Sequence, residues 1–162
     1  ARTSFMFDCR TLIDYVVPLT VTPAGVHFRR EQNHFMCGAV PTSDVAIDAS
    51  DFEIRHDEFE ELIWPTVARY VPQFDQIGIV TSWGGQYDYN TLDHNLILGP
   101  GSEVDNFFFA NGFSGHGLQQ GPGVGRGLSE LITYGAFRSI DLAPLSYTRI
   151  ERNEPFLESA VI

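Results

Sequence analysis

The residues best suited to chemistry lie in a glycine-rich stretch that follows a run of phenylalanines. Glycine occupies positions 112, 115, 117, 121, 123, 125 and 127, and His116 stands among them. Glycine adopts positive φ without steric cost and lets the main chain approach a flat ligand without a Cβ clash. If a helix begins near Gly123, its N-terminus and the N–H groups of the preceding turn form a site that suits negative charge. The spacing therefore predicts a ligand-binding turn between a buried strand and a helix.

Two other interpretations of the same glycines stay open. Glycines also allow a helix to pack closely on a sheet without binding a ligand. The run GPGVGRG, which starts at Gly121, superficially matches the GxGxxG dinucleotide fingerprint. That fingerprint opens a βαβ unit and is followed about 20 residues later by an acidic residue for the ribose, and both features are missing here. The run is therefore a poor candidate for a pyrophosphate-binding loop.

Polar residues upstream of the glycines are weaker candidates for a functional role. Tyr87 and Tyr89 could line a ligand site, although tyrosines in strands more often serve as half-buried packing residues. Asp93 and His94 look like an acid–base pair, but adjacent residues of a strand point to opposite faces of the sheet, so we assign them no catalytic role. The two cysteines lie far apart and show no zinc-ligand spacing, so the sequence predicts no metal site.

One long string carries a family resemblance. NGFSGHGLQQGPGVGRGLSEL, preceded by YDYNTLDHNLILGP, resembles the C-terminal signature of the D-amino-acid oxidase and sarcosine oxidase superfamily of FAD-dependent amine oxidoreductases. The shared pattern is a tyrosine-rich strand, Thr-x-Asp-x-x-x-Ile-x-Gly, and Gly-Phe-Ser-Gly-His-Gly before a helix. The runs GVHFRRE, EELIWPTVARYVPQF and IDLAPLSYTRI make the chain most similar to a mitochondrial branch of the superfamily that is linked to the assembly of respiratory complex I. The resemblance covers nearly all of residues 20–162.

The resemblance implies that the chain is the C-terminal part of an FAD-dependent oxidoreductase that holds its flavin noncovalently. Substrate oxidation would be hydride transfer from a C–H bond next to an amine nitrogen. The catalytic candidates are His116, Tyr87 and Tyr89. The residues expected beside the flavin are Gly112, Phe113, Ser114, Gly115, His116, Gly117, Leu118 and Gln119. Gln119 stands where relatives that oxidise sarcosine have a lysine for the substrate carboxylate, which puts an amino-acid substrate in doubt.

The resemblance also implies partners. The superfamily holds the FAD pyrophosphate on an N-terminal βαβ unit that this sequence lacks, so we expect a missing N-terminal portion of the FAD domain, or other protein subunits, to complete the site. Two functions stay open: an enzyme completed in this way, or a non-catalytic subunit or assembly factor of mitochondrial complex I. Mitochondrial localisation is expected from the resemblance alone.

The elements that must position the turn are predicted by the pattern of apolar residues. Strand-like runs at 11–21, 25–30 and 34–40 predict an antiparallel meander. From 57 to 70 the apolar residues recur at steps of three and four, which predicts an amphipathic helix. Pro65 lies inside this helix and is expected to kink or split it.

The second half of the chain is expected to form the strand, turn and helix of the site. Strands are predicted at 78–83 and 94–100. Residues 106–110 contain three adjacent phenylalanines, which predicts a strand buried on both faces. The helix that starts near Gly123 is expected to end at Gly135.

These elements predict an α+β chain, and the resemblance implies that its fold is incomplete and divided as follows. Residues 1–80 are expected to form part of a substrate-type antiparallel-sheet domain with a covering helix. Residues 81–136 would contain the end of the sheet and the flavin-facing strand, turn and helix of an FAD-binding α/β domain. Residues 137–162 are expected to form an extended C-terminal tail.

Composition excludes several classes of partner. The 162 residues are 43% hydrophobic, which is enough to build a core. The formal net charge of −11 repels nucleic acid and anionic membrane surfaces alike. No apolar run is long enough to predict a transmembrane segment.

Overall fold

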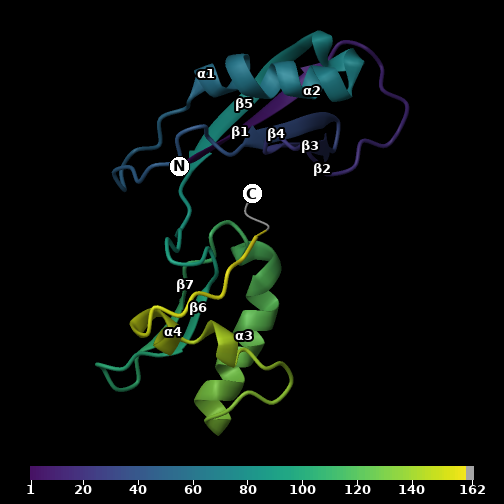
Figure 1. Ribbon diagram of the computed structural model, residues 1–162. Coiled ribbons are helices and arrows are strands. Elements are labelled where there is room, and N and C mark those ends of the chain that lie inside the picture. Colours follow the sequence, from purple (N-terminus) through teal and green to yellow (C-terminus); the bar gives the residue numbers. More distant parts are fainter. Residues whose placement is uncertain (160–162) are drawn as a thin grey trace. The chain divides into compact units, whose positions relative to one another are not determined.

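The computed structural model describes residues 1–159, which form two compact units. The first unit runs from Ala1 to Gln86, and the second begins at Tyr87. Each unit combines strands with helices (Figure 1). The predicted α+β class is confirmed.

The first unit contains a five-stranded sheet and a helical segment. The strands are β1 (Arg2–Cys9), β2 (Thr20–Val21), β3 (Val26–Glu31), β4 (His34–Ala39) and β5 (Ile77–Gly85). The helical segment, between β4 and β5, consists of α1 (His56–Glu58), the π-helical turn η1 (Phe59–Ile63), α2 (Trp64–Tyr70) and the 3₁₀ turn η2 (Pro72–Asp75).

The sheet is antiparallel throughout, in the order β2-β3-β4-β1-β5. Along β1, Phe5 and Phe7 are fully buried, whereas Ser4 and Met6 are partly exposed. This alternation is typical of a sheet with one face on a core. The helical segment covers that face in Figure 1. β5 continues to Gly85 because it pairs with β1, so the unit extends beyond the boundary expected near residue 80.

The strand predictions for this unit were partly wrong. β3 and β4 form as predicted, but the run 11–21 contributes only the two-residue strand β2, and β1 was not predicted. Within that run Ile13 and Val17 are buried, while their neighbours Leu12 and Val16 are exposed. In a strand Tyr15 would share their face, but it is 46% exposed, so Ile13 and Val17 anchor a loop on the core.

The predicted helix forms between His56 and Tyr70, and Pro65 does not split it. The chain changes to π-helical geometry before the proline, and the Trp64 N–H donates to the carbonyl of Phe59, five residues earlier. A proline ring inside a regular α-helix collides with the carbonyl four residues back. The wider π turn accommodates the ring at this point, so the helix continues.

The core of the first unit lies between this helical segment and the sheet. The helix contributes buried residues one turn apart, namely Phe59, Ile63 and Val67. Phe74 of η2 is fully buried among the rings of the sheet, with its centroid 5.0 Å from Phe7, 4.8 Å from Phe35 and 6.1 Å from Phe28. This aromatic cluster fixes η2 against the sheet.

The second unit contains a hairpin, a long helix and a shorter helical tail. Its elements are β6 (Ile97–Pro100), β7 (Phe108–Asn111), α3 (Gly117–Tyr134), the 3₁₀ turn η3 (Ala143–Leu145) and α4 (Tyr147–Glu151). β6 and β7 pair antiparallel. Leu96, Leu98 and Val124 form a small core beneath the hairpin.

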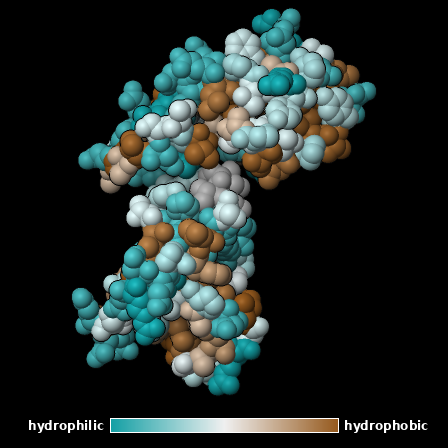
Figure 2. Space-filling view, viewed as in Figure 1, coloured by the Kyte–Doolittle hydropathy of each residue, from teal (hydrophilic) through white to brown (hydrophobic). Residues whose placement is uncertain are grey.

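The phenylalanine run is more exposed than predicted. Phe107 has 49% of its surface exposed, and no residue of β7 is fully buried. Figure 2 shows apolar residues at the surface of both units. The prediction of burial on both faces was wrong for the described residues, because the elements packed on β7 leave side chains on both of its faces partly or fully exposed.

α3 begins at Gly117, six residues before its predicted start, and ends at Gly135 as predicted. Gly135 has a φ of 71°, and its N–H donates to the carbonyl of Leu131. Several glycines of the run therefore lie within the helix. At Gly127 a Cβ would come within 2.5 Å of the Leu142 side chain, so this glycine allows the segment after α3 to pack closely on the helix.

The segment after Gly135 is also more structured than the expected extended tail. It contains η3 and α4, and Arg149 of α4 is only 5% exposed. This arrangement depends on a partner in the 88–96 segment. Weak local alternation of polar and apolar residues carries no information about such a contact.

Candidate functional site

The turn between β7 and α3 has an unusual backbone. Gly112, Ser114 and Gly115 have φ angles of 72°, 48° and 96°. Glycine adopts such angles freely, whereas a residue with a Cβ, such as Ser114, is strained there. Three left-handed residues lie within four positions, so the turn needs contacts with the surrounding residues to stabilise its conformation.

Hydrogen bonds from an upstream segment hold this turn. The Gly112 N–H donates to Oδ2 of Asp88 at 2.7 Å, and the Ser114 N–H donates to the Asp88 carbonyl at 3.3 Å. The Asn90 N–H donates to Oγ of Ser114 at 3.0 Å. The conformation of the glycine turn is therefore set by residues more than 20 positions earlier in the chain.

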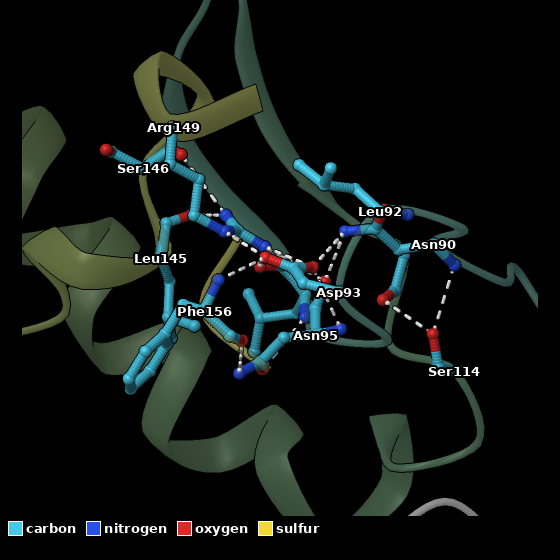
Figure 3. A network of polar contacts seen from close by, with 11 residues as sticks. Asn90, Leu92, Asp93, Asn95, Ser114, Leu145, Ser146, Arg149 and Phe156 are labelled. Atoms are coloured by element: carbon cyan, nitrogen blue, oxygen red, sulfur yellow. Dashed lines mark hydrogen bonds and ion pairs between the residues drawn. The ribbon is translucent and has the colours of Figure 1, made fainter. Parts of the chain in front are cut away.

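The same segment contains a buried polar network centred on Asp93 (Figure 3). Asp93 is fully buried, and its carboxylate accepts hydrogen bonds from Nε and Nη2 of Arg149 at 2.7 and 3.1 Å. It also accepts bonds from the Asn90 side chain at 2.8 Å and from the N–H groups of Asn95 and Phe156 at 3.2 and 3.0 Å. Burial by itself raises the pKa of Asp93, but the bonds from Arg149, Phe156 and Asn95 outweigh it and hold the pKa below its usual value.

Arg149 has partners for its remaining N–H groups as well. Nη1 donates to the carbonyls of Leu145 and Ser146, and Nη2 donates to those of Asn95 and Leu96. A guanidinium has five N–H groups in a fixed fork, and this arrangement uses all three of its nitrogens. Arg149 therefore ties the C-terminal segment to the segment that holds the glycine turn.

The N-terminus of α3 offers hydrogen-bonding groups to a ligand. His116 is the N-cap residue, but no side chain caps the helix. Nδ1 of His116 is buried and has no hydrogen-bond partner among the described residues. A helix N-terminus carries free N–H groups and partial positive charge. Together these groups suit a hydrogen-bond acceptor or a negatively charged edge. Leu118 and Gln119, in the first turn, are both exposed.

The two candidate tyrosines are placed differently. The ring of Tyr87 lies at the turn, where a Cβ on Gly115 would come within 2.8 Å of its Cε2 atom. The ring of Tyr89 lies 5.1 Å from that of His94, and Tyr89 is 40% exposed. His94 has a φ of 59°, so this stretch is a turn and not a strand.

Asp93 takes no part in an acid–base pair with its neighbour in sequence. Its carboxylate is occupied by the buried network, which sequence reasoning missed. The aspartate within Thr-x-Asp was visible in the sequence, but its arginine partner 56 residues later was not.

The glycines at 121, 123 and 125 do not form a phosphate-binding loop. They lie within α3, where their N–H groups belong to the helix, and a Cβ at any of them would meet open space. This placement agrees with the prediction that GPGVGRG is not a dinucleotide fingerprint.

The first unit contributes one further polar group that sequence reasoning missed. His27 lies on the sheet face opposite the helical segment, and a Cβ on Gly38 would come within 2.9 Å of its ring. Its Nδ1 is buried and has no hydrogen-bond partner in residues 1–159. Burial lowers the pKa of His27, and the charges of Arg29 and Arg2 lower it further.

The described residues lack two further features. Residues 1–159 contain no group of three or more His, Cys, Asp or Glu side chains that could hold a metal ion. No helix in this range is long and apolar enough to cross a membrane.

Comparison with known proteins places these features in a family. Residues 3–131 match the family model described as FAD dependent oxidoreductase. The chain is 43% identical over 147 residues to FAD-dependent oxidoreductase domain-containing protein 1 of Xenopus laevis, covering 90% of this chain and 30% of that protein. It is 37% identical over 163 residues to the protein of the same name from Bos taurus, covering 99% of this chain and 34% of that protein.

Solved structures share the fold. L-proline dehydrogenase from P. horikoshii matches with a TM-score of 0.81 and 21% identity, over 97% of this chain and 40% of that chain. Iminodiacetate oxidase from Chelativorans sp. BNC1 matches with a TM-score of 0.65 and 16% identity, over 90% of this chain and 38% of that chain. The chain spans about a third of the length of the curated relatives that it matches.

Proposed function

Because this chain belongs to the family of FAD-dependent oxidoreductases, we propose that it forms the flavin-facing wall of an amine-type oxidoreductase. The observation that carries the proposal is the glycine turn before α3, with its uncapped helix N-terminus and the unpartnered Nδ1 of His116. The rest of the cofactor site would come from the remaining two thirds of the full-length protein.

The residues of the turn fit one edge of a flavin ring. The pyrimidine edge of the ring presents hydrogen-bond acceptors, and the start of α3 presents donors and partial positive charge. The residues that would hold this edge are those of the turn and the first helical turn, namely Gly112, Phe113, Ser114, Gly115, His116, Gly117, Leu118 and Gln119. The glycine turn between β7 and α3 follows an antiparallel hairpin, and the described residues contain no βαβ unit whose loop could hold the pyrophosphate. The pyrophosphate would therefore be held elsewhere in the protein. No cysteine lies near Gln86 or Tyr87, where some members of the superfamily bond to the flavin, so the cofactor would be held noncovalently.

The chemistry follows from the family. When bound, the flavin would accept a hydride from a C–H bond next to an amine nitrogen of the substrate, leaving an imine that water hydrolyses. This chain contributes position and electrostatics. The N-terminus of α3 stabilises negative charge beside the turn. Gln119 provides no charge for a substrate carboxylate, so the substrate is not required to be an amino acid.

The visible absorbance spectrum of the purified full-length protein tests this proposal. Noncovalently bound flavin gives two bands in the near-ultraviolet and blue, and acid precipitation releases the flavin into the supernatant. A protein without these bands that also takes up no added FAD would contradict the proposal.

An exposed apolar segment supports a second function, that of an assembly factor for mitochondrial respiratory complex I. In the loop before β2, Leu12, Val16 and Leu19 are 85%, 83% and 62% exposed. Exposed apolar residues that are close together are typical of protein interaction surfaces. The resemblance of the sequence to the mitochondrial branch of the superfamily motivates the choice of partner.

Cells that lack the protein provide the test of this second function. Complementation with Leu12→Ser/Val16→Ser should leave complex I under-assembled on native gels. Exposed Thr11→Ser in the same loop serves as the matched control. Normal assembly with the double variant would remove the loop from this role.

A further inference from the structure

We propose that Arg149 is a positioning residue for the flavin site: through Asp93 and Asn90 it holds the glycine turn in its ligand-binding conformation. The inference rests on the proposed function, since it assigns a role in the same site. Arg149 touches no residue of the turn in any of its hydrogen bonds, so its effect is transmitted by other side chains.

The backbone of the glycine turn is strained at Ser114. Ser114 is fully buried and has a positive φ, which costs free energy for a residue with a Cβ. Such a conformation persists only where surrounding contacts over-determine it. The turn therefore needs a rigid support, and the segment that provides the support is part of the site.

Asn90 is the contact point between the support and the turn. Its backbone N–H donates to Oγ of Ser114 at 3.0 Å, and this Oγ lies 3.3 Å from the carbonyl of Gly112, to which it donates. A Cβ on Gly112 would lie only 3.2 Å from the Cβ of Asn90. A small displacement of Asn90 would therefore disturb two of the left-handed residues together.

Asn90 is itself held by hydrogen bonds of its side chain. Its side-chain amide donates to Oδ1 of Asp93 at 2.8 Å and to the Asn95 carbonyl at 2.7 Å. Asp93 in turn is fully buried, and Arg149 neutralises its charge with two bonds. Without Arg149 the carboxylate would be a buried, unpaired charge, and it would have to move towards water or take up a proton. Either change alters the acceptor that fixes Asn90.

The C-terminal segment completes this support. The Phe156 N–H donates to Oδ2 of Asp93 at 3.0 Å, and the Asn95 side chain donates to the Phe156 carbonyl at 3.2 Å. In Figure 3, Asp93 lies between Arg149 and Asn90, and Asn90 lies next to Ser114. The segment that carries Arg149 and Phe156 thus supplies the hydrogen bonds to Asp93 that complete the network supporting the glycine turn.

A second buried carboxylate in the same unit provides a matched control. Glu130 of α3 is 3% exposed and accepts hydrogen bonds from Arg126, Ser139 and the N–H group of Arg138. None of these bonds reaches the 88–96 segment or the glycine turn within the described residues. Neutralising Glu130 should cost stability as neutralising Asp93 does, but it should leave the turn in place.

The experiment compares Arg149→Lys, Asp93→Asn and Glu130→Gln in the full-length protein. Thermal unfolding measures the loss of stability, and titration of the apoprotein with FAD measures affinity. If the competent turn falls to about a tenth of the molecules, the Kd for FAD rises about tenfold. We expect this rise and a shifted flavin spectrum for the Arg149 and Asp93 variants, whereas Glu130→Gln keeps the wild-type Kd and spectrum. A similar rise in all three variants, or unchanged Kd in the first two, would overturn the positioning role.

Amide hydrogen exchange separates this inference from the proposed function. In the apoprotein, the N–H groups of Gly112 and Ser114 should exchange faster in Arg149→Lys than in wild type, and at the wild-type rate in Glu130→Gln. Faster exchange in a protein that takes up no FAD would support the positioning role and reject the flavin site. Unchanged exchange in a protein that binds FAD would reject the positioning role alone. If Asp93→Asn does not fold, because it leaves the buried Arg149 guanidinium without a counter-charge, the charge-conserving Arg149→Lys gives the same readout.

Discussion

Gly115 is the residue of the turn with the tightest steric constraint. It combines a φ of 96° with a distance of 2.8 Å between an added Cβ and Cε2 of Tyr87. From the sequence we expected a larger side chain here to intrude on the flavin ring. In the structure, a larger side chain at Gly115 would collide first with the Tyr87 ring, and this collision would distort the turn.

Replacing Gly115 with valine should therefore damage both folding and flavin binding. We expect a loss of at least about 1–3 kcal/mol from the left-handed backbone alone, measured by urea unfolding. The amount of flavin that copurifies with the variant should fall to the background level of unbound flavin. Gly125→Ala is the control, because nothing lies within 4 Å of its Cβ position. It should stabilise α3 by up to about 1 kcal/mol. Wild-type flavin content in Gly115→Val would contradict the assigned contact.

Glu130 gives a prediction about pH. Hydrogen bonds from the Ser139 hydroxyl, from the N–H groups of Arg138 and Ser139 and from Arg126 lower its pKa from 4.5 to about 2. A carboxyl whose pKa is lower in the folded state stabilises the fold above its unfolded pKa and loses this effect as the pH falls. The contribution of Glu130 should therefore be complete above pH 4.5 and disappear as the pH approaches 2.

The measurement is the free energy of unfolding against pH for wild type and Glu130→Gln. The stability advantage of wild type should be constant above pH 4.5 and shrink between pH 4.5 and about 2. A difference that stays constant down to pH 2 would show that these hydrogen bonds do not favour the ionised form.

At the scale of elements, the short 3₁₀ turn η2 depends on one aromatic residue. Phe74 is fully buried among three phenylalanines of the sheet. η2 directly precedes β5, so its position determines where that edge strand begins. The first unit should therefore lose much of its stability when this ring is removed.

Phe74→Ala should cost about 3–5 kcal/mol, because it removes a large buried ring and leaves a cavity. Denaturant unfolding, monitored on a tryptophan of the first unit such as Trp64, provides the value. Trp64 is suitable because its Nε1 donates to the Phe74 carbonyl. Phe52→Ala, at a residue 59% exposed, is the control and should change stability by less than about 0.5 kcal/mol. A small effect at Phe74 would mean that the cluster repacks.

At the scale of the whole molecule, the family relation sets what this chain can do. The chain covers 30% and 34% of its relatives from Xenopus laevis and Bos taurus. Its described residues provide the glycine turn before α3 and an antiparallel sheet, and they contain no βαβ unit for the pyrophosphate. Flavin binding is therefore expected to be a property of the full-length protein.

This expectation can be tested with two polypeptides. The 162-residue chain should bind FAD far more weakly than the full-length protein, because it can contact only part of the cofactor. Isothermal titration of both with FAD gives the ratio of their affinities. Equal affinities would mean that the glycine turn and α3 hold the whole cofactor. In that event the division of the site proposed above is wrong.

The sequence by itself determined the features that depend on neighbouring residues. The glycine turn, the end of α3 at Gly135, strands β3 and β4 and the helix ending at Tyr70 follow from local spacing and backbone preference. The α+β class followed from the same patterns, whereas the family was inferred from the resemblance of whole sequence motifs. The strand before residue 10 and the start of α3 at Gly117 were missed, because glycine and mixed polar residues give weak local signals.

Only the tertiary structure decided what supports the turn. Asp93 and Arg149 are 56 residues apart, and neither reveals the other through local pattern. Their pairing forms because a buried charge must find a partner, and the chain can supply that partner from any distance in sequence. The spacing of the glycines is enough to predict a turn that could contact a ligand. Its fixed shape depends on contacts that exist only after the chain has folded.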